Sequence, residues 1–287
     1  MSPHNLNKLI GDAADRLVSV GIDDGAVEAE LILCELFDFD RLHLYLHGPS
    51  LIDDEIVQKF EDIITRRLTR YPLQYILGNA WFFGRKFIVN EAVMVPCPET
   101  ELLLDSLLRS VRFCRSNPVR LLDVGVGSGV IAVSAKLENP LLDVTAVDIS
   151  DKALAVARQN AAQLEVDQSI RFMRSDLFAG LDEGEKFDII ASNPPYIASD
   201  EYGTLPPEVK ADPKVALVAG EKGLDVITRL IAEAPEYLTR PGFLMFEIGY
   251  NQAAEVFAMI EKDARYGSAT LLKDLSDIDR VVVCRVE

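Results

Sequence analysis

The tetrapeptide Asn193-Pro194-Pro195-Tyr196 is the most chemically distinctive stretch of this chain, and it ends an apolar run over 187–193. The two prolines fix φ and remove two backbone donors, so neither a strand nor a helix continues through them. A tight turn is the simplest interpretation, because Asn-Pro is a common turn dipeptide. The motifs around it decide whether the tetrapeptide does more than turn the chain.

The glycine-rich segment DVGVGSG (123–129) begins at the end of the apolar run 120–124 and continues into a loop. Glycines after a parallel strand allow a sharp turn and let a ligand approach the next helix N-terminus. A dinucleotide fingerprint needs glycine at position 130, where the chain has Val130. An acid so close to the loop favours a ligand with positive charge, such as S-adenosylmethionine, over an anionic dinucleotide pyrophosphate. A turn chosen for geometry alone stays open as the alternative. The predicted cofactor-binding residues are Asp123, Gly125, Val126, Gly127, Ser128 and Gly129.

Two further acids stand at the ends of predicted strands. Asp148 closes the run 143–148, where a carboxylate can accept both ribose hydroxyls of a nucleoside, besides capping the next helix. Asp176 ends the run 170–176 and Leu177 follows it. The two could bracket an adenine ring with one polar and one apolar group. With Ile149 and Asn193, these residues complete the predicted adenosyl pocket at one edge of the sheet.

Two regions with different periodicity position these motifs. Residues 4–78 carry apolar residues at helical spacing, which predicts a helical bundle. A hairpin is expected around Gly84-Arg85. Beyond residue 99, apolar runs alternate with helical segments, and the last two runs have no helix between them. We therefore expect a helical domain at 1–78, a hairpin linker at 79–98, and over 99–287 a doubly wound, mostly parallel, seven-stranded Rossmann-like α/β domain.

Composition weighs against several classes of function. The net charge of −17 opposes tight binding to phosphate backbones, so no direct nucleic-acid binding is expected. The four scattered cysteines and three early histidines predict neither a disulfide framework nor a metal site. The apolar runs are too short for a membrane span, and the N-terminus does not resemble a signal peptide. We expect a cytoplasmic monomer.

The motif order resembles class I S-adenosylmethionine-dependent methyltransferases that act on nitrogen in planar groups. The whole chain is most similar to the release factor glutamine methyltransferase family (HemK/PrmC). The segments that carry this resemblance are YPLQYILG at 71–78, the F-x-V hairpin at 87–89, VPCPETE at 95–101, NPPYI, and IDRVVV at 278–283. The family usually has arginine where Cys97 stands and often an acid where Lys222 stands.

The resemblance implies that the protein methylates the side-chain amide nitrogen of the glutamine in the GGQ motif of class I peptide chain release factors. The methyl donor would be S-adenosylmethionine and the product S-adenosylhomocysteine. In the family, the side-chain oxygen of Asn193 and the backbone carbonyl of Pro194 accept the two amide hydrogens. Pro195 stiffens the loop and Tyr196 packs on the glutamine. Residues 1–78 would bind the release factor.

Other functions remain open from the sequence. A ribosomal protein glutamine methyltransferase shares the NPPY tetrapeptide, although VPCPETE favours the release factor enzyme. A nucleic-acid amino-methyltransferase is opposed by the charge, and a non-catalytic S-adenosylmethionine-binding module is suggested by Cys97. For Glu247, in the run 242–249, a place on the pocket wall is one alternative, and a solvent-exposed acid at a strand end is the simpler expectation.

Overall fold

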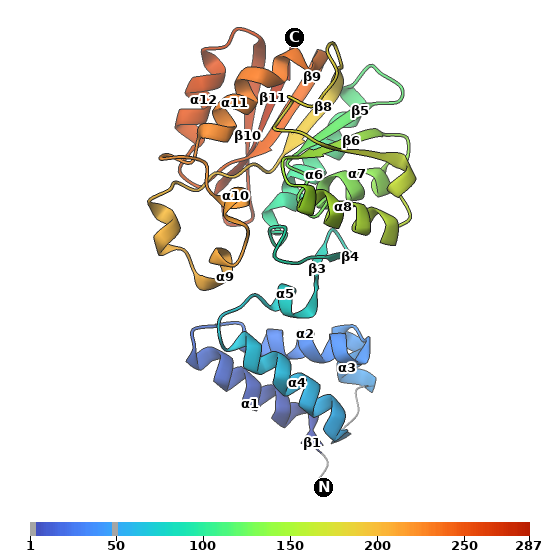
Figure 1. The fold of residues 1–287 in the computed structure, drawn as a ribbon, viewed down its shortest axis with the longest axis vertical. Coiled ribbons are helices and arrows are strands. Elements are labelled where there is room, and N and C mark those ends of the chain that lie inside the picture. The colour runs from blue at the N-terminus through green and yellow to red at the C-terminus, as the bar shows by residue number, and fades with distance from the viewer. Residues whose placement is uncertain (1–3, 48–50) are drawn as a thin grey trace. The chain divides into compact units, whose positions relative to one another are not determined.

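The computed structural model describes residues 4–47 and 51–287. The chain divides into two compact units (Figure 1). The first consists of Met1–Gly78 together with the short segment Pro206–Ala211, and the second of Asn79–Leu205 and Asp212–Glu287. The hairpin that the sequence predicts as a linker lies in the second unit, as β3 (Asn79–Phe82) and β4 (Arg85–Ile88).

The first unit is the predicted helical bundle. A short antiparallel pair joins β1 (His4–Asn5) to β2 (Leu51–Ile52). The Asn5 side chain caps the first helix by accepting the Lys8 N–H at 3.1 Å. Four of its helices contribute fully buried residues to the core: Leu17, Ile32, Leu33, Leu44, Phe60 and Ile64. The helices are α1 (Leu6–Ser19), α2 (Gly25–Phe37), α3 (Arg41–His47), α4 (Asp54–Arg67) and α5 (Leu73–Leu77).

The segment Pro206–Ala211, which contains α9 (Pro207–Lys210), is held in the first unit by ion pairs. Glu208 accepts from Arg67 Nη1 at 2.9 Å and from Arg70 Nη2 at 2.8 Å. Partial burial works against the charge of Glu208, but the hydrogen bonds from Arg70 and Arg67 hold its pKa down at about 2. Arg67 is itself nearly buried and also binds Glu28 with two nitrogens.

The second unit is built on a seven-stranded sheet in the order β10-β11-β9-β8-β5-β6-β7. Strands β5 to β9 run parallel, and β11 pairs antiparallel with both β9 and β10. This arrangement confirms the predicted fold class, including the antiparallel pair at one edge. The strands are β5 (Arg120–Val124), β6 (Asp143–Asp148), β7 (Ile170–Arg174), β8 (Phe187–Ser192), β9 (Leu238–Glu247), β10 (Tyr266–Lys273) and β11 (Asp279–Val286).

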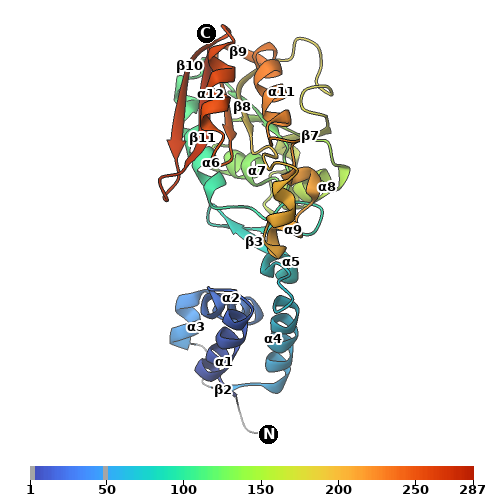
Figure 2. The same ribbon diagram turned by 90° about the vertical axis from the view of Figure 1, so that its left-hand side faces the viewer.

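Helices cover both faces of this sheet, as Figure 2 shows. Because side chains alternate along a strand, neighbouring residues pack in different cores. Leu121 belongs to the core under α6, α7 and α8, whereas Leu122 belongs to the core under α11 and α12. These helices are α6 (Glu99–Ser110), α7 (Val130–Glu138), α8 (Asp151–Gln163), α11 (Asp225–Glu233) and α12 (Ala253–Glu261).

Some strand ends differ from the prediction. Strand β7 ends at Arg174, so Asp176 lies in the following turn, and β8 ends at Ser192. Strand β9 begins at Leu238 rather than at residue 242 and includes Pro241. A register shift accommodates this proline, since Phe187 pairs with Leu238 while Ile189 pairs with Phe243. In the described part of the chain, no helix combines the length and apolarity needed to cross a membrane.

Candidate functional site

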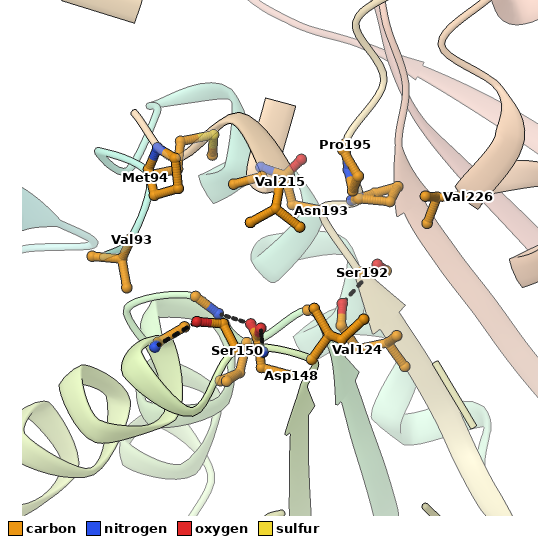
Figure 3. A pocket seen from close by; sticks show the side chains of 18 of the residues that line it. Val93, Met94, Val124, Asp148, Ser150, Ser192, Asn193, Pro195, Val215 and Val226 are labelled. Atoms are coloured by element: carbon orange, nitrogen blue, oxygen red, sulfur yellow. Dashed lines mark hydrogen bonds between the residues drawn. The ribbon is translucent and has the colours of Figure 1, made fainter. Parts of the chain in front are cut away.

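A cavity of about 290 Å³ lies in the second unit at the carboxyl ends of β5, β6 and β8 (Figure 3). The strand order explains its place: β5 continues to β6 on one side and pairs with β8 on the other. Ligands of open α/β sheets bind at such a switch point. Val124 and Ser192 are register partners, so the glycine loop and the NPPY tetrapeptide start side by side.

The cavity brings together most of the residues that the sequence singles out. It is lined by Gly125, Val126, Gly127, Ser128, Asp148, Ile149, Asp176, Leu177, Asn193, Pro194 and Pro195. Three predicted site residues do not line it: Asp123, Gly129 and Tyr196.

The glycine loop is fixed by backbone contacts to the neighbouring strand. The N–H groups of Gly125 and Val126 both donate to the carbonyl of Val147 at 2.9 Å. Gly129 has φ of +87°, and a Cβ there would lie 3.2 Å from the Cβ of Ala157. Glycine at this position therefore serves the turn and the packing of α8, which accounts for its place outside the cavity wall.

Asp148 is one of two acids on the cavity wall, with Asp176. Its Oδ2 accepts the Gly127 N–H at 3.0 Å and its Oδ1 accepts the Ser150 N–H at 2.8 Å. Burial raises the pKa of Asp148, while these backbone donors work in the opposite direction. A carboxylate has about four acceptor positions, so two remain for a ligand.

Asp123 lies beneath the loop rather than beside the cavity. It shares the strand face of Leu121 under α7, because side chains alternate along β5. Its Oδ2 accepts the Ala132 N–H at 3.0 Å, and its Oδ1 has no hydrogen-bond partner among the described residues. Complete burial raises the pKa of this carboxyl to about 7. The structure gives Asp123 a part in positioning α7.

Asp176, which the sequence predicts beside an adenine ring, has a partner that sequence reasoning missed. Arg229 Nη1 donates to Asp176 Oδ1 at 2.9 Å, and both residues line the cavity. Both side chains are roughly half-exposed. Since Arg229 lies 53 residues from Asp176, only the fold could bring the two together.

The NPPY tetrapeptide is tied to a buried acid from β9. Asn193 Nδ2 donates to Thr100 Oγ1 at 3.0 Å, and Thr100 donates to Glu247 Oε2 at 2.8 Å. The hydroxyl of Tyr196 donates to Glu247 Oε1 at 3.0 Å, which explains why its ring does not line the cavity. Glu247 is only 1% exposed, so the expectation of a solvent-exposed acid is wrong. Burial raises the pKa values of both Glu247 and Tyr196.

Sequence reasoning also missed the outer wall of the cavity. Figure 3 shows Val93, Met94, Val215 and Val226 around the opening opposite Asp148. Val93 and Met94 lie outside helices and strands, whereas Val215 lies in α10 (Lys214–Leu217) and Val226 in α11. No local pattern in the sequence marks which of these residues face a cavity. Thr100 could have been found, because it stands inside the quoted VPCPETE element.

The two departures from the family pattern are both accommodated. Burial raises the pKa of the Cys97 thiol to about 12, and its Sγ lies 3.8 Å from the carbonyl of Val95. Lys222 forms an exposed contact with Glu255 at 3.4 Å. Neither residue lines the cavity.

Comparison with known proteins identifies the family. The model of the PrmC N-terminal domain matches residues 8–78, and that of the methyltransferase small domain matches residues 98–205. The release factor glutamine methyltransferase of Nitratidesulfovibrio vulgaris is 36% identical over 282 residues, covering 98% of this chain and 95% of the relative. That of Cereibacter sphaeroides is 38% identical and covers 96% of each chain. The chain belongs to the release factor glutamine methyltransferase family.

Membership of the release factor glutamine methyltransferase family confirms the resemblance expected from the motifs. Solved structures with lower identity agree on the fold alone. The hMettl16 catalytic domain in complex with a 3'UTR hairpin is 15% identical, with a TM-score of 0.58 and coverage of 90% of this chain and 91% of that chain. A T. thermophilus 16S rRNA methyltransferase in complex with AdoMet and guanosine is 18% identical, with a TM-score of 0.51 and coverage of 73% and 50%.

Within residues 4–47 and 51–287, no group of three or more His, Cys, Asp or Glu residues is placed to hold a metal ion.

Proposed function

We propose that the protein transfers a methyl group from S-adenosylmethionine to the side-chain amide nitrogen of the GGQ glutamine in class I peptide chain release factors. One observation carries this proposal: Asn193 lines the cavity with its NH₂ group engaged by Thr100. Across the described residues, no donor reaches Asn193 Oδ1. An acceptor held ready in this way suits an amide N–H.

The cavity fits the proposed methyl donor. Asp148 has two acceptor positions left for a ribose diol, and the walls around it are apolar enough for an adenine ring. The charged side chains that line the cavity are Asp148, Asp176 and Arg229, and Arg229 is paired with Asp176. This balance favours a ligand with positive charge over a phosphate. The cavity volume lies close to the lower end of the about 300–1,000 Å³ range of small-molecule sites.

We assign residues to the binding of S-adenosylmethionine by their place on the cavity wall. Gly125, Val126, Gly127, Ser128 and Asp148 would bind the glycine-loop side of the donor. Ile149, Asp176 and Leu177 would hold the adenine. We assign Asp123 and Gly129, which the sequence also predicts as contacts, to positioning α7 and α8 instead.

The chemical problem is the poor nucleophilicity of an amide nitrogen, whose lone pair is delocalised into the carbonyl. S-Adenosylmethionine supplies an electrophilic methyl group on a sulfonium. In our proposal, Asn193 Oδ1 and the backbone carbonyl of Pro194 accept the two amide hydrogens and turn the nitrogen toward the cavity. As the N–C bond forms and the S–C bond breaks, sulfur keeps the electron pair and the amide proton leaves to water.

Positioning supplies the rate enhancement in this mechanism. Well-oriented reactants can gain about 7–11 kcal/mol relative to free encounter. Pro194 and Pro195 keep the backbone stiff, and Gln252 Nε2 donates to the Tyr196 carbonyl at 2.9 Å behind them. Because the methylated amide loses its proton readily, no strong base is required.

The release factor is the proposed protein partner, and the helical unit over residues 1–78 is the proposed binding domain. We place the activity in the cytoplasm and expect a monomer that binds no nucleic acid directly, in line with the net charge of −17.

Methyl-labelled S-adenosylmethionine and a purified class I release factor test the proposal. Label is expected in the GGQ glutamine, and a release factor with that glutamine changed to alanine is expected to stay unlabelled. Transfer only to ribosomal protein or to nucleic acid would overturn the release factor assignment. Binding of S-adenosylmethionine without any transfer would instead support a non-catalytic binding module.

A further inference from the structure

A chain of hydrogen bonds behind the cavity links three residues from distant parts of the second unit. Asn193 Nδ2 donates to Thr100 Oγ1 at 3.0 Å, and the Thr100 hydroxyl donates to Glu247 Oε2 at 2.8 Å. Thr100 stands in the first turn of α6, and Glu247 is the last residue of β9. Thr100 is 2% exposed and Glu247 is 1% exposed. Little of either residue is open to water, although Thr100 also lines the cavity.

The donor and acceptor inventory gives this chain a direction. An ionised carboxylate only accepts hydrogen bonds, whereas a hydroxyl has one proton to donate and two lone pairs. The Thr100 proton is committed to Glu247, so Thr100 Oγ1 can only accept from its other neighbour. Of the two ends of the Asn193 side chain, only the NH₂ can donate. With Glu247 ionised, the oxygen of Asn193 then points away from Thr100.

The alternative orientation of Asn193 is costly for the same reason. With the amide turned over, Oδ1 would face Thr100 Oγ1 with no proton between the two oxygens. The NH₂ group would then take the place of the free acceptor at the cavity. A buried polar atom without a partner destabilises that orientation.

The same carboxylate also fixes the far end of the tetrapeptide. Glu247 Oε1 accepts the Tyr196 hydroxyl at 3.0 Å, so the Glu247 side chain accepts hydrogen bonds from both Thr100 and Tyr196. Tyr196 therefore cannot supply the missing donor to Thr100, and Glu247 remains the acceptor for both.

We propose that Glu247 and Thr100 are positioning residues that set the amide orientation of Asn193, so that its oxygen rather than its NH₂ group faces the substrate amide. Neither residue is expected to touch the transferred methyl group. This inference rests on the proposed glutamine methylation and deepens it. It assigns a role in the reaction to the threonine of VPCPETE and to an acid that the sequence places at a strand end.

Thr100→Val tests this hydrogen-bond chain from Asn193 through Thr100 to Glu247, here called the relay. Valine keeps the shape of threonine and removes the hydroxyl. We expect kcat for release factor methylation to fall about 10–100-fold, the equivalent of losing one hydrogen bond in a charged network. The dissociation constant for S-adenosylmethionine is expected to stay unchanged. Thr100→Ser retains the hydroxyl and is the matched control, with kcat expected near that of the parent protein.

A double-mutant cycle separates positioning from general destabilisation. If Thr100 acts through Asn193, then Thr100→Val should reduce kcat no further in an Asn193→Ala background. Independent, multiplicative losses would overturn the inference, as would an unchanged kcat in Thr100→Val or an equal loss in Thr100→Ser. Should the valine variant not fold, as judged by thermal unfolding, the smaller Thr100→Ala substitutes for it in the same cycle.

The outcomes for the relay and for the proposed function are distinct. The parent protein is assayed first with labelled S-adenosylmethionine and the release factor. Failure of the parent to label the glutamine contradicts the proposed function. Normal labelling by the parent together with a Thr100 effect independent of Asn193 contradicts only the relay.

Discussion

Asn160, in the helix α8, donates a hydrogen bond of 2.8 Å to the carbonyl of Ser128 in the glycine loop. The same side chain donates to the carbonyl of Ile88 at 2.9 Å and accepts the Ile88 N–H at 2.6 Å. Asn160 is fully buried. A single amide thus ties the loop at the cavity to the β4 strand of the hairpin, 72 residues away.

Replacing Asn160 with alanine is expected to destabilise the second unit, because three backbone groups at buried or partly buried contacts lose their partner. Each such group costs about 1–3 kcal/mol when left unsatisfied. Denaturant unfolding measures the change. Gln163→Ala is the control, because Gln163 donates from the same helix to the same hairpin, at Lys86, from an exposed position. Equal effects of the two substitutions would contradict the importance of the buried amide.

Gly223 lies so close to the NPPY segment that a Cβ there would be 2.1 Å from the carbonyl oxygen of Tyr196. Gly223→Ala is therefore expected to displace this segment, to reduce turnover, and to destabilise the protein by about 1–3 kcal/mol beyond the backbone strain. Gly184→Ala isolates that strain, since Gly184 has a similar positive φ with open space around it. Methylation assays and unfolding of the two variants give the comparison, and a similar turnover in both would count against the close approach.

Asp148→Asn is expected to weaken binding of S-adenosylmethionine about 10–100-fold. The amide removes the charge that suits the ribose hydroxyls, and a hydrogen bond to a charged group is worth about 1.5–3 kcal/mol. Isothermal titration calorimetry gives the dissociation constant. Asp151→Asn serves as the control, because Asp151 is an exposed acid three residues along with only a surface contact to Arg174. Equal affinities for the parent and Asp148→Asn would exclude Asp148 from the ligand site.

Asp123 is expected to make stability depend on pH. Burial raises its pKa from 3.8 to about 7, so the folded state holds this proton more tightly than the unfolded state does. The contribution of Asp123 to stability is complete below pH 3.8 and is lost as the pH rises through about 7. Each unit of pKa difference is worth about 1.4 kcal/mol.

Asp123→Asn removes this titration while keeping an oxygen for the Ala132 N–H. We expect the unfolding free energy of the variant, relative to the parent, to rise between pH 5 and pH 8 in denaturant titrations. A difference that stays constant with pH would show that Asp123 is ionised in the folded state throughout this range. Unchanged affinity for S-adenosylmethionine at pH 8 would support the structural role given to Asp123 over its predicted part in ligand binding.

Local features of the sequence were enough to predict the fold class and several of the residues that line the cavity. Strands β5 and β6 begin and end where the apolar runs begin and end, because glycine or a polar acid interrupts each run. The order of strands and helices then fixes which loops meet at one sheet edge. Asp148, Asn193 and the glycine loop could thus be assigned to a common site in advance.

Contacts between distant segments could not be predicted in this way. The partners of Asn160, Thr100 and Glu247 lie 32 to 147 residues away, so no local pattern marks them. The sequence also could not predict which way the side chain of an acid near a strand end points. Asp123 and Asp148 both look like strand-end acids in the sequence, yet one lies under α7 and the other on the cavity.

The sequence by itself determined which chemical groups reach the carboxyl edge of the sheet, because strand and loop formation depend on local residue patterns. The tertiary structure decided how these groups are used. Burial and hydrogen-bond geometry depend on segments that meet only after folding, and they leave Asn193 with one free acceptor and Glu247 without water.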